Sequence, residues 1–339
     1  MPAAQDSPTD SAFDVLAVGN ALVDVLAPVD DDLVAELGQV KGMASLVDLS
    51  EAERLYAAAQ PIVEVAGGAA ANTAVGAASL GSRAAFVGKV ADDRLGRLFE
   101  TDIKAAGVDY ETCIAADGVM TGRCLSLVSP DAERTMSTYL GAAAQLRAED
   151  IDDAAVGRAR VTHLEAYLWD LADAERMLGR VMADAHGSGG MVSVSLSDPS
   201  CVQRHADSFR RLVRGEIDVL FANEDEITLL LDVDDVTAAA EVVRSLDIIA
   251  ALTLGPNGSL VVSRDETVRV DAHPVDKVVD VTGAGDFYAA GFLHGLTHGA
   301  DLRTCGRLGS LAAGEIISHL GARPEVPLRP LAQEAGLLH

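Results

Sequence analysis

The chain has 339 residues, and its 26 basic and 52 acidic side chains give a formal net charge of −26. Hydrophobic residues make up 49% of the sequence, which is typical of a globular protein and excludes a disordered or collagen-like chain. The acidic balance argues against nucleic acid as a partner, because affinity for its phosphates depends on clustered Lys and Arg. Small anions are still allowed, since backbone amides bind them locally.

The sequence predicts a cytoplasmic protein without a membrane segment. The four cysteines form no CxxC pair, and their low density predicts reduced thiols. No stretch approaches the roughly 20 consecutive apolar residues that cross a bilayer. Residues 1–11 are polar and acidic, lack the regions of a signal peptide, and are predicted to form a disordered tail.

Short apolar runs alternate with helical patterns along the chain, which predicts an α/β fold with helices on both faces of a parallel sheet. The expected strands are Asp14–Gly19, Ala84–Gly88, Val161–Ala166, Met191–Leu196, Ile217–Ala222 and Ile248–Leu254. The expected helices are Ala69–Leu80, Arg94–Ala106, Asp173–Ala185, Ser208–Arg214, Val236–Ser245, Gly285–His298 and Leu302–Leu320. Two stretches, Leu22–Leu49 and Thr112–Tyr139, break this alternation with short β segments. They predict either one small β layer or two unrelated surface hairpins.

The most informative segment is Val278–Phe292. A short β-rich run ends at the turn Thr282–Asp286, and a helix pattern begins at once. Small residues in the turn let several amides point at one spot, and a helix N-terminus adds partial positive charge there. Such a turn suits an anion whose charge grows during phosphoryl transfer, and Asp286 beside it could accept a proton from an attacking hydroxyl. The same sequence also fits an alternative in which Asp286 is only an acidic residue of the first helical turn, without a catalytic role.

Further polar residues follow predicted strand ends or open a helix. Asp24 follows the first strand, where ligands of parallel sheets bind, or is a solvated loop acid. Gly68 and Asn72 open a helix, where they could meet a polar ligand or only cap and pack. Asn223–Glu226 offers oxygen ligands for Mg²⁺ or a helix cap. Thr253–Gly258 reads as a strand end running into a turn.

Histidines provide no pattern of metal ligands. Their spacing to acids and cysteines predicts structural or surface roles for His163, His186, His205 and His294.

Together these segments resemble the ribokinase-like carbohydrate kinases, also called the PfkB family, from about Phe13 to Pro327. The motifs that carry the resemblance are GGAAANTA at Gly67–Ala74, NEDE at Asn223–Glu226, TLGPNG at Thr253–Gly258 and DVTGAGDF at Asp280–Phe287. Four further features resemble the adenosine kinase branch, namely GNALVD at Gly19–Asp24, YLGAA at Tyr139–Ala143, EAYLWD at Glu165–Asp170 and LGARP at Leu320–Pro324.

The resemblance implies a three-layer α/β/α domain with a small β-sheet lid. Residues 12–21, 50–111 and 140–339 would form the large nucleotide- and substrate-binding domain. Residues 22–49 and 112–139 would form the lid, so that each part is assembled from separate stretches of the chain.

The resemblance also implies roles for residues. Asp286 would be the base that deprotonates the acceptor hydroxyl, beside an anion hole made by the amides of Gly283, Ala284 and Gly285. The residues expected to bind the acceptor are Asn20, Asp24, Gly68 and Asn72. Those expected along the ATP site are Thr253, Gly255, Gly258, Asn223 and Arg134, although Arg134 would also fit a solvated hairpin.

Metal sites are implied in the same way. Asn223 and Glu226 would organise Mg²⁺ through its waters. Asp280 and Thr282 match the place where some relatives hold a monovalent cation such as K⁺.

The resemblance therefore implies an ATP-dependent kinase that phosphorylates the ribose 5′-hydroxyl of a nucleoside, adenosine first, in purine salvage, as a monomer or homodimer. The alternatives are a kinase of ribose or fructose, a kinase of guanosine or inosine, and a non-catalytic nucleoside-binding protein. An apolar lid would favour a purine, or would only pack on itself. Its apolar side chains are Leu46, Val47, Met120, Leu125, Leu127 and Met136.

Overall fold

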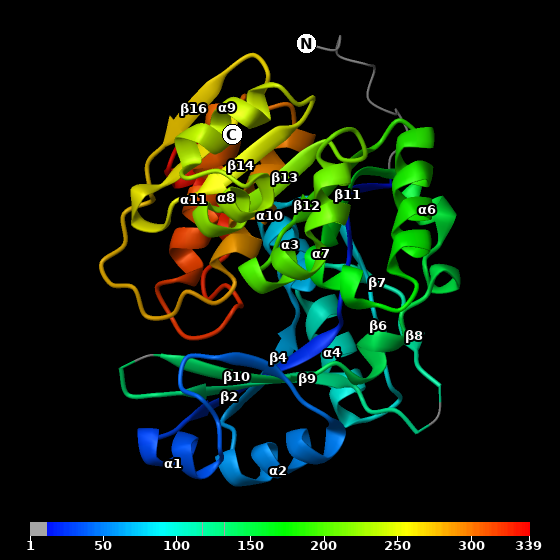
Figure 1. Ribbon diagram of the computed structural model, residues 1–339, viewed down its shortest axis with the longest axis vertical. Coiled ribbons are helices and arrows are strands. Elements are labelled where there is room, and N and C mark those ends of the chain that lie inside the picture. The colour runs from blue at the N-terminus through cyan, green and yellow to red at the C-terminus, as the bar shows by residue number, and fades with distance from the viewer. Residues whose placement is uncertain (1–11, 117, 132) are drawn as a thin grey trace.

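Two β-sheets organise the chain (Figure 1). The computed structural model describes residues 12–116, 118–131 and 133–339, so the predicted tail at residues 1–11 lies outside the described residues. The larger sheet has nine strands in the order β16-β15-β14-β13-β12-β11-β1-β5-β7. Its strands are β1 Phe13–Val18, β5 Ala84–Val87, β7 Asp109–Tyr110, β11 Ala159–Glu165, β12 Met191–Ser195, β13 Val219–Asn223, β14 Ile249–Thr253, β15 Ser259–Val262 and β16 Thr267–Val270.

Within this sheet, the seven strands from β14 across to β7 run parallel to one another. Strands β15 and β16 add an antiparallel hairpin at the other edge, beside β14. Alternate residues of a strand face opposite layers, as the two-residue period requires. On β1, Val15 and Ala17 belong to the core under α3, α10 and α11, whereas Leu16 and Val18 belong to the core under α6 to α9. The large domain therefore has the predicted α/β/α layers.

Helices cover both faces of this sheet. The helices of the chain are α1 Asp31–Glu36, α2 Leu49–Ala59, α3 Ala69–Leu80, α4 Arg94–Ala105, α5 Asp153–Val156, α6 Ala174–Gly187, α7 Pro199–Leu212, α8 Glu224–Leu231, α9 Val236–Arg244, α10 Ala284–Thr297, α11 Leu302–Ile316 and α12 Leu328–Glu334. None of the helices in the described part of the chain combines the length and the apolar character that a membrane crossing requires.

The six predicted strands are confirmed to within two residues at each end, and the predicted helix Ala69–Leu80 is α3 without any change. The predicted start of a helix at Ser208 is wrong, because Asp198 caps α7 and Pro199 occupies its first turn. Residues 278–281, expected to be β-rich, form no strand. Helices α2, α8 and α12 and the hairpin of β15 and β16 were not predicted.

The second sheet has five strands in the order β3-β10-β9-β2-β4, and we call it the lid sheet. Its strands are β2 Leu22–Pro28, β3 Ala44–Leu46, β4 Val63–Gly67, β9 Gly122–Val128 and β10 Arg134–Tyr139. It lies below the large domain in Figure 1, with α1 and α2 on its far side. The two stretches that broke the alternation thus share one β layer and are not unrelated hairpins.

The boundaries expected for the lid need two corrections. Strand β4 pairs with β2 from Leu22 opposite Gly67 to Leu26 opposite Val63, and α2 packs on β9 and β10, so residues 49–67 belong with the lid. Strand β8, Cys113–Ile114, instead pairs with β6, Lys89–Val90, in a separate two-stranded sheet. Both errors concern strand partners distant in sequence, which periodicity does not report.

Candidate active site

Two cavities meet at the N-terminus of α10, near the carboxyl ends of the parallel strands. The α8 cavity, of about 330 Å³, is lined by Asn223, Glu226 and Thr253 among others. The lid cavity, of about 360 Å³, lies between the large domain and the lid sheet. Ala69, Tyr167 and Asp286 line both cavities. Asp286 therefore stands where the contents of one cavity would meet the contents of the other.

Asp286 lies in the first turn of α10, which Gly283 opens with φ +79°. A Cβ at Gly283 would come within 2.7 Å of the Ala322 Cβ, so the turn requires glycine for both reasons. Asn72 Nδ2 donates a hydrogen bond to Asp286 Oδ2 at 2.9 Å, and Thr73 Oγ1 donates to the Asp286 carbonyl at 3.1 Å. These bonds hold the carboxylate against α3.

Burial raises the pKa of Asp286 to about 7. The hydrogen bond from Asn72 and the charge of Arg323 act in the opposite direction, while the charges of Glu165 and Asp24 raise the pKa further. A carboxylate with a pKa near neutrality is suited to take up a proton during a reaction at physiological pH.

The backbone beside Asp286 offers free donors. The amides of Gly283, Gly285 and Asp286 have no hydrogen-bond partner among the described residues. The amide of Ala284 donates to the Val281 carbonyl at 3.2 Å, so it is not free as the sequence had suggested. Because these amides lie at a helix N-terminus, they form a site suited to an anion.

Asn20 is held by a buried carboxylate. Its backbone amide and its Nδ2 donate to Glu165 Oε1 at 2.9 and 2.7 Å, and Ala70 N donates to Glu165 Oε2 at 2.8 Å. Burial raises the pKa of Glu165 to about 7. Asn20 Oδ1 is buried without a partner among the described residues, so it can accept a hydrogen bond from a ligand.

Gly68 fixes the approach of α3 to Asn20. It has φ +100°, and a Cβ there would lie 2.2 Å from the Asn20 carbonyl oxygen. The residues expected to bind an acceptor are thus brought together around the lid cavity, whose lining includes Asn20, Asp24, Gly68 and Asn72.

Asp24 lies within the stretch that was expected to form the lid. It is the third residue of β2 in the lid sheet, not a loop residue after the first strand, and it is partly buried. Burial raises its pKa to about 6, and the charges of Arg323 and Arg134 lower it. A Cβ at Gly67, on the neighbouring strand, would lie 2.3 Å from the Asp24 carboxylate. The interpretation of Asp24 as a solvated acid is wrong.

Arg134, expected at the phosphates, instead pairs with Asp280 in the structure. Its Nη2 contacts Asp280 Oδ2, and both side chains are almost fully buried, at 9% and 2% exposure. Asp280 also accepts hydrogen bonds from the amides of Gly321 at 2.7 Å and Thr282 at 3.0 Å. This ion pair joins lid strand β10 to the loop before α10. Arg134 is therefore not a solvated hairpin residue, and the carboxylate of Asp280 is not free to bind a cation.

Asn223 and Glu226 form a capping box at the start of α8. Glu226 N donates to Asn223 Oδ1 at 2.8 Å, and Asn223 N donates to Glu226 Oε2 at 2.9 Å. The helix-cap interpretation is therefore confirmed, while both residues also line the α8 cavity. Burial raises the pKa of Glu226 to about 7, so a nearby cation would favour its ionised form.

Thr253 ends β14 and lines the α8 cavity. Gly255 and Gly258 lie just beyond it, in a 3₁₀ turn where both have positive φ. They are not part of the cavity lining, and an ordinary turn accounts for their conformation.

Three residues of the site were not identified from the sequence. Glu165 and Tyr167 fall in the motif EAYLWD, and Arg323 falls in LGARP. Both motifs were noted as similar to adenosine kinases, but no role was predicted for these three residues. Tyr167 is an aromatic side chain where the two cavities meet. Arg323 donates to Asn72 Oδ1 at 2.5 Å. Their importance follows from partners far away in the sequence.

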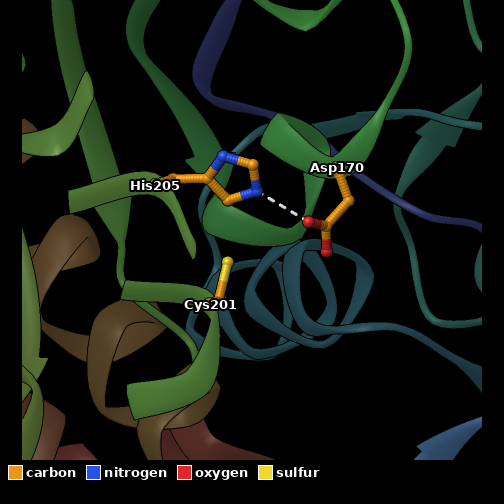
Figure 2. Close-up of side chains that lie close together, drawn as sticks. All are labelled: Asp170, Cys201 and His205. Carbon is orange, nitrogen blue, oxygen red and sulfur yellow. Dashed lines mark hydrogen bonds and ion pairs between the residues drawn. The ribbon is translucent and has the colours of Figure 1, made fainter. Parts of the chain in front are cut away.

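A second cluster has the composition of a metal site but not its chemistry. Figure 2 shows Asp170, Cys201 and His205, whose ligand atoms lie within 4.8 Å of one another. His205 Nε2 bonds to Asp170 Oδ1 at 2.6 Å, and Arg204 pairs with Asp170 Oδ2 at 2.7 Å. Burial raises the pKa of the Cys201 thiol to about 12, which keeps it protonated. The cluster is an ion-pair network, consistent with a structural role for His205.

The raised pKa of Asp286 predicts a pH-dependent effect of Asp286→Asn on stability. An unfolded Asp loses its proton near pH 3.9, whereas folded Asp286 holds its proton to about pH 7. Between these values the folded state binds more protons, so the contribution of Asp286 to stability falls as pH rises. We expect the melting temperature of the Asn variant minus that of the wild type to increase from pH 5 to pH 8 in differential scanning fluorimetry. A difference that stays constant with pH would contradict the raised pKa.

The chain is similar to known kinases in sequence and in fold. The family model described as pfkB family carbohydrate kinase matches residues 14–329. The solved structure of an adenosine kinase from Sinorhizobium meliloti is 45% identical, with a TM-score of 0.90, covering 96% of this chain and 100% of that one. A probable sugar kinase from Rhizobium etli CFN 42 is 41% identical, with a TM-score of 0.91, covering 97% of this chain and 100% of that one.

A nucleoside kinase from Methanothermobacter thermautotrophicus is 30% identical over 270 residues, which is 77% of this chain and 81% of the relative. A match over residues 14–329 extends far beyond any shared motif. The chain therefore belongs to the pfkB family of carbohydrate kinases and is a phosphotransferase that acts on a hydroxyl group.

Proposed function

We propose that this kinase phosphorylates the ribose 5′-hydroxyl of adenosine, converting adenosine and ATP to AMP and ADP. Asp286 acts as the base that takes the hydroxyl proton, and the free amides beside it bind the transferred phosphoryl group. The observation that carries the proposal is the position of Asp286 where two cavities meet, one for the phosphate donor and one for the acceptor. Phosphoryl transfer depends on such positioning more than on covalent chemistry.

The lid cavity supports a nucleoside as the acceptor. Its lining includes the polar side chains of Asn20, Asp24 and Asn72, which suit sugar hydroxyls. Leu46 and Met136 line it from the lid, and Tyr167 adds an aromatic ring that can stack on a base.

The other apolar side chains of the lid give less support for a nucleoside acceptor than the sequence suggested. Leu125 and Leu127 are buried in the core on the other side of the lid sheet, and Met120 is 38% exposed. The lid thus packs partly on itself and partly faces the cavity.

ATP and Mg²⁺ are the proposed donor and metal. Asn223 and Glu226 line the α8 cavity, and carboxylate and amide oxygens suit Mg²⁺ held through water beside phosphates. Bound Mg²⁺ would neutralise phosphate charge as it develops. We do not propose a site for a monovalent cation, because the carboxylate of Asp280 is already paired with the guanidinium of Arg134.

The test is ATP- and Mg²⁺-dependent turnover with adenosine, guanosine, inosine, cytidine, ribose and fructose. The proposal expects the highest kcat/KM with adenosine. A higher value for ribose or fructose would keep Asp286 as the base and discard the nucleoside. If one compound binds tightly and none is phosphorylated, the result would favour a non-catalytic binding protein over the proposed kinase.

Two lid methionines provide a matched pair for the acceptor. Met136→Lys places a charge in the lid cavity, and we expect it to raise KM for adenosine at least about tenfold, which corresponds to about 1.4 kcal/mol. Met120→Lys, in the loop before β9 and outside the lining of the lid cavity, should leave KM within about twofold of wild type. Equal KM values for the two variants would show that the base does not contact the lid.

A further inference from the structure

A chain of hydrogen bonds runs from the loop after α11 to the base. Arg323 Nη1 donates to Asn72 Oδ1 at 2.5 Å, and Asn72 Nδ2 donates to Asp286 Oδ2 at 2.9 Å. Asn72 is only 4% exposed, so water does not readily replace either partner. Arg323 lines neither the α8 cavity nor the lid cavity, and any effect it has on the reaction passes through Asn72 or through its charge.

The direction of this chain follows from the donors and acceptors. A guanidinium only donates hydrogen bonds, so it selects the oxygen end of the Asn72 amide. The nitrogen end is then left to face Asp286, where it donates to the carboxylate. Without Arg323, the amide could turn over and place its oxygen against a carboxylate oxygen, which is repulsive.

The charge of Arg323 opposes a group of acids. Asp286 faces Glu165 at the end of β11 and Asp24 on β2, and both raise its pKa, whereas Arg323 lowers it. Arg134 from β10 and Asp280 from the loop before α10 also act on Asp24. These groups come from β2, β10, β11, the loop before α10 and the loop after α11.

Arg323 itself sits in an unfavourable place. Burial lowers its pKa to about 10, so it stays charged at neutral pH, supported by Asp24, Asp102 and Asp286. Its Nε and Nη2 atoms are buried and have no hydrogen-bond partner among the described residues. Nη1 also donates to the Ala322 carbonyl at 2.7 Å. A charge desolvated to this extent is costly, which argues for a role other than stability.

We infer that Arg323 is a positioning residue that, through Asn72, holds Asp286 ready to receive the proton of the acceptor hydroxyl. The inference rests on the proposed role of Asp286 as the base and does not depend on which acceptor is used. It assigns a role to a residue whose sequence motif carried none.

The test compares Arg323→Met, which removes charge and donor at similar length, with Arg323→Lys, which retains both. In the Met variant, the acidic limb of the pH profile of kcat should move up by about one pH unit. At pH 7 the same variant should lose about fivefold in kcat, with KM for the acceptor nearly unchanged. In the Lys variant, the acidic limb of the pH profile of kcat should lie close to its wild-type position. Arg329→Met, on α12, is the control and should give the wild-type profile.

A second readout does not require turnover. The ¹³C signal of the Asp286 carboxyl, assigned by its loss in Asp286→Asn, should titrate at higher pH in Arg323→Met than in wild type. If the wild type turns over no acceptor, the proposed function fails, while this titration still decides the inference. A lower kcat without displacement of the limb, or an Asp286 titration unchanged by Arg323→Met, would overturn it. Should the Met variant not fold, Arg323→Leu removes both charge and donor and provides the same comparison.

Discussion

Replacing Asp286 by Asn is expected to lower kcat about a thousandfold, because the amide cannot accept the proton of the acceptor hydroxyl. The new side chain has nearly the same shape, and its oxygen can still receive the hydrogen bond from Asn72. The buried charge is lost, so the fold should be at least as stable as in the wild type at pH 8. Affinity for ATP and acceptor should therefore remain close to the wild-type values.

The measurement is kcat with the best acceptor, alongside the ligand-induced change in melting temperature. Asp31→Asn is the matched control, because Asp31 is also a first-turn acid, in α1 of the lid, and is exposed. It should keep wild-type kcat. An Asp286→Asn enzyme with kcat within tenfold of wild type would remove Asp286 from the role of base.

Breaking the ion pair of Arg134 and Asp280 is expected to have the largest effect on stability. Asp280→Asn leaves the guanidinium of Arg134 buried without its counter-charge, which should cost about 3 kcal/mol of unfolding free energy. Arg134→Met should cost less, because Asp280 keeps its hydrogen bonds from the amides of Gly321 and Thr282. Both variants loosen the contact between lid and anion site, so kcat and KM should change together.

A double-mutant cycle measures the pair directly. The double variant should be less destabilised than the sum of the single variants, with a coupling energy above about 1.5 kcal/mol in chemical denaturation. The exposed pair of Arg97 and Asp92, at 65% and 79% exposure, is the control. Its coupling should stay below about 1 kcal/mol. Equal couplings for the two pairs would mean that the lid is not held by Arg134.

The elements of the large domain were predictable because their patterns are local. A strand buried on both faces is almost entirely apolar, as β13 and β14 are up to their last residue, and α3 is bounded by Gly68 and Gly81, both with positive φ. The start of α7 was missed although Asp198 and Pro199 are a strong helix-start signal. The letters at the start of α8 were recognised as a helix cap, but the bounds of the helix that follows were not predicted.

The site was predictable to a smaller extent. Asp286 and its glycine turn lie in one continuous motif, and Gly68 and Asn72 lie in another, so their chemistry is visible in the letters. The hydrogen bond between Asn72 and Asp286 joins residues 214 positions apart, and that between Arg323 and Asn72 spans 251 positions. No local pattern indicates such pairs, which explains why Arg323 received no role.

By itself, the sequence determined most strands and helices of the large domain, which turn places amides at a helix N-terminus, and which carboxylate stands beside them. These properties depend on neighbours within a few residues, through hydrogen-bond periodicity and the conformational freedom of glycine. The tertiary structure alone decided that β4 joins the lid, that Arg134 binds Asp280, and that Glu165 and Arg323 support Asn20 and Asn72. Burial and charge are set by contacts between distant segments, and these contacts also raise the pKa of Asp286 to about 7.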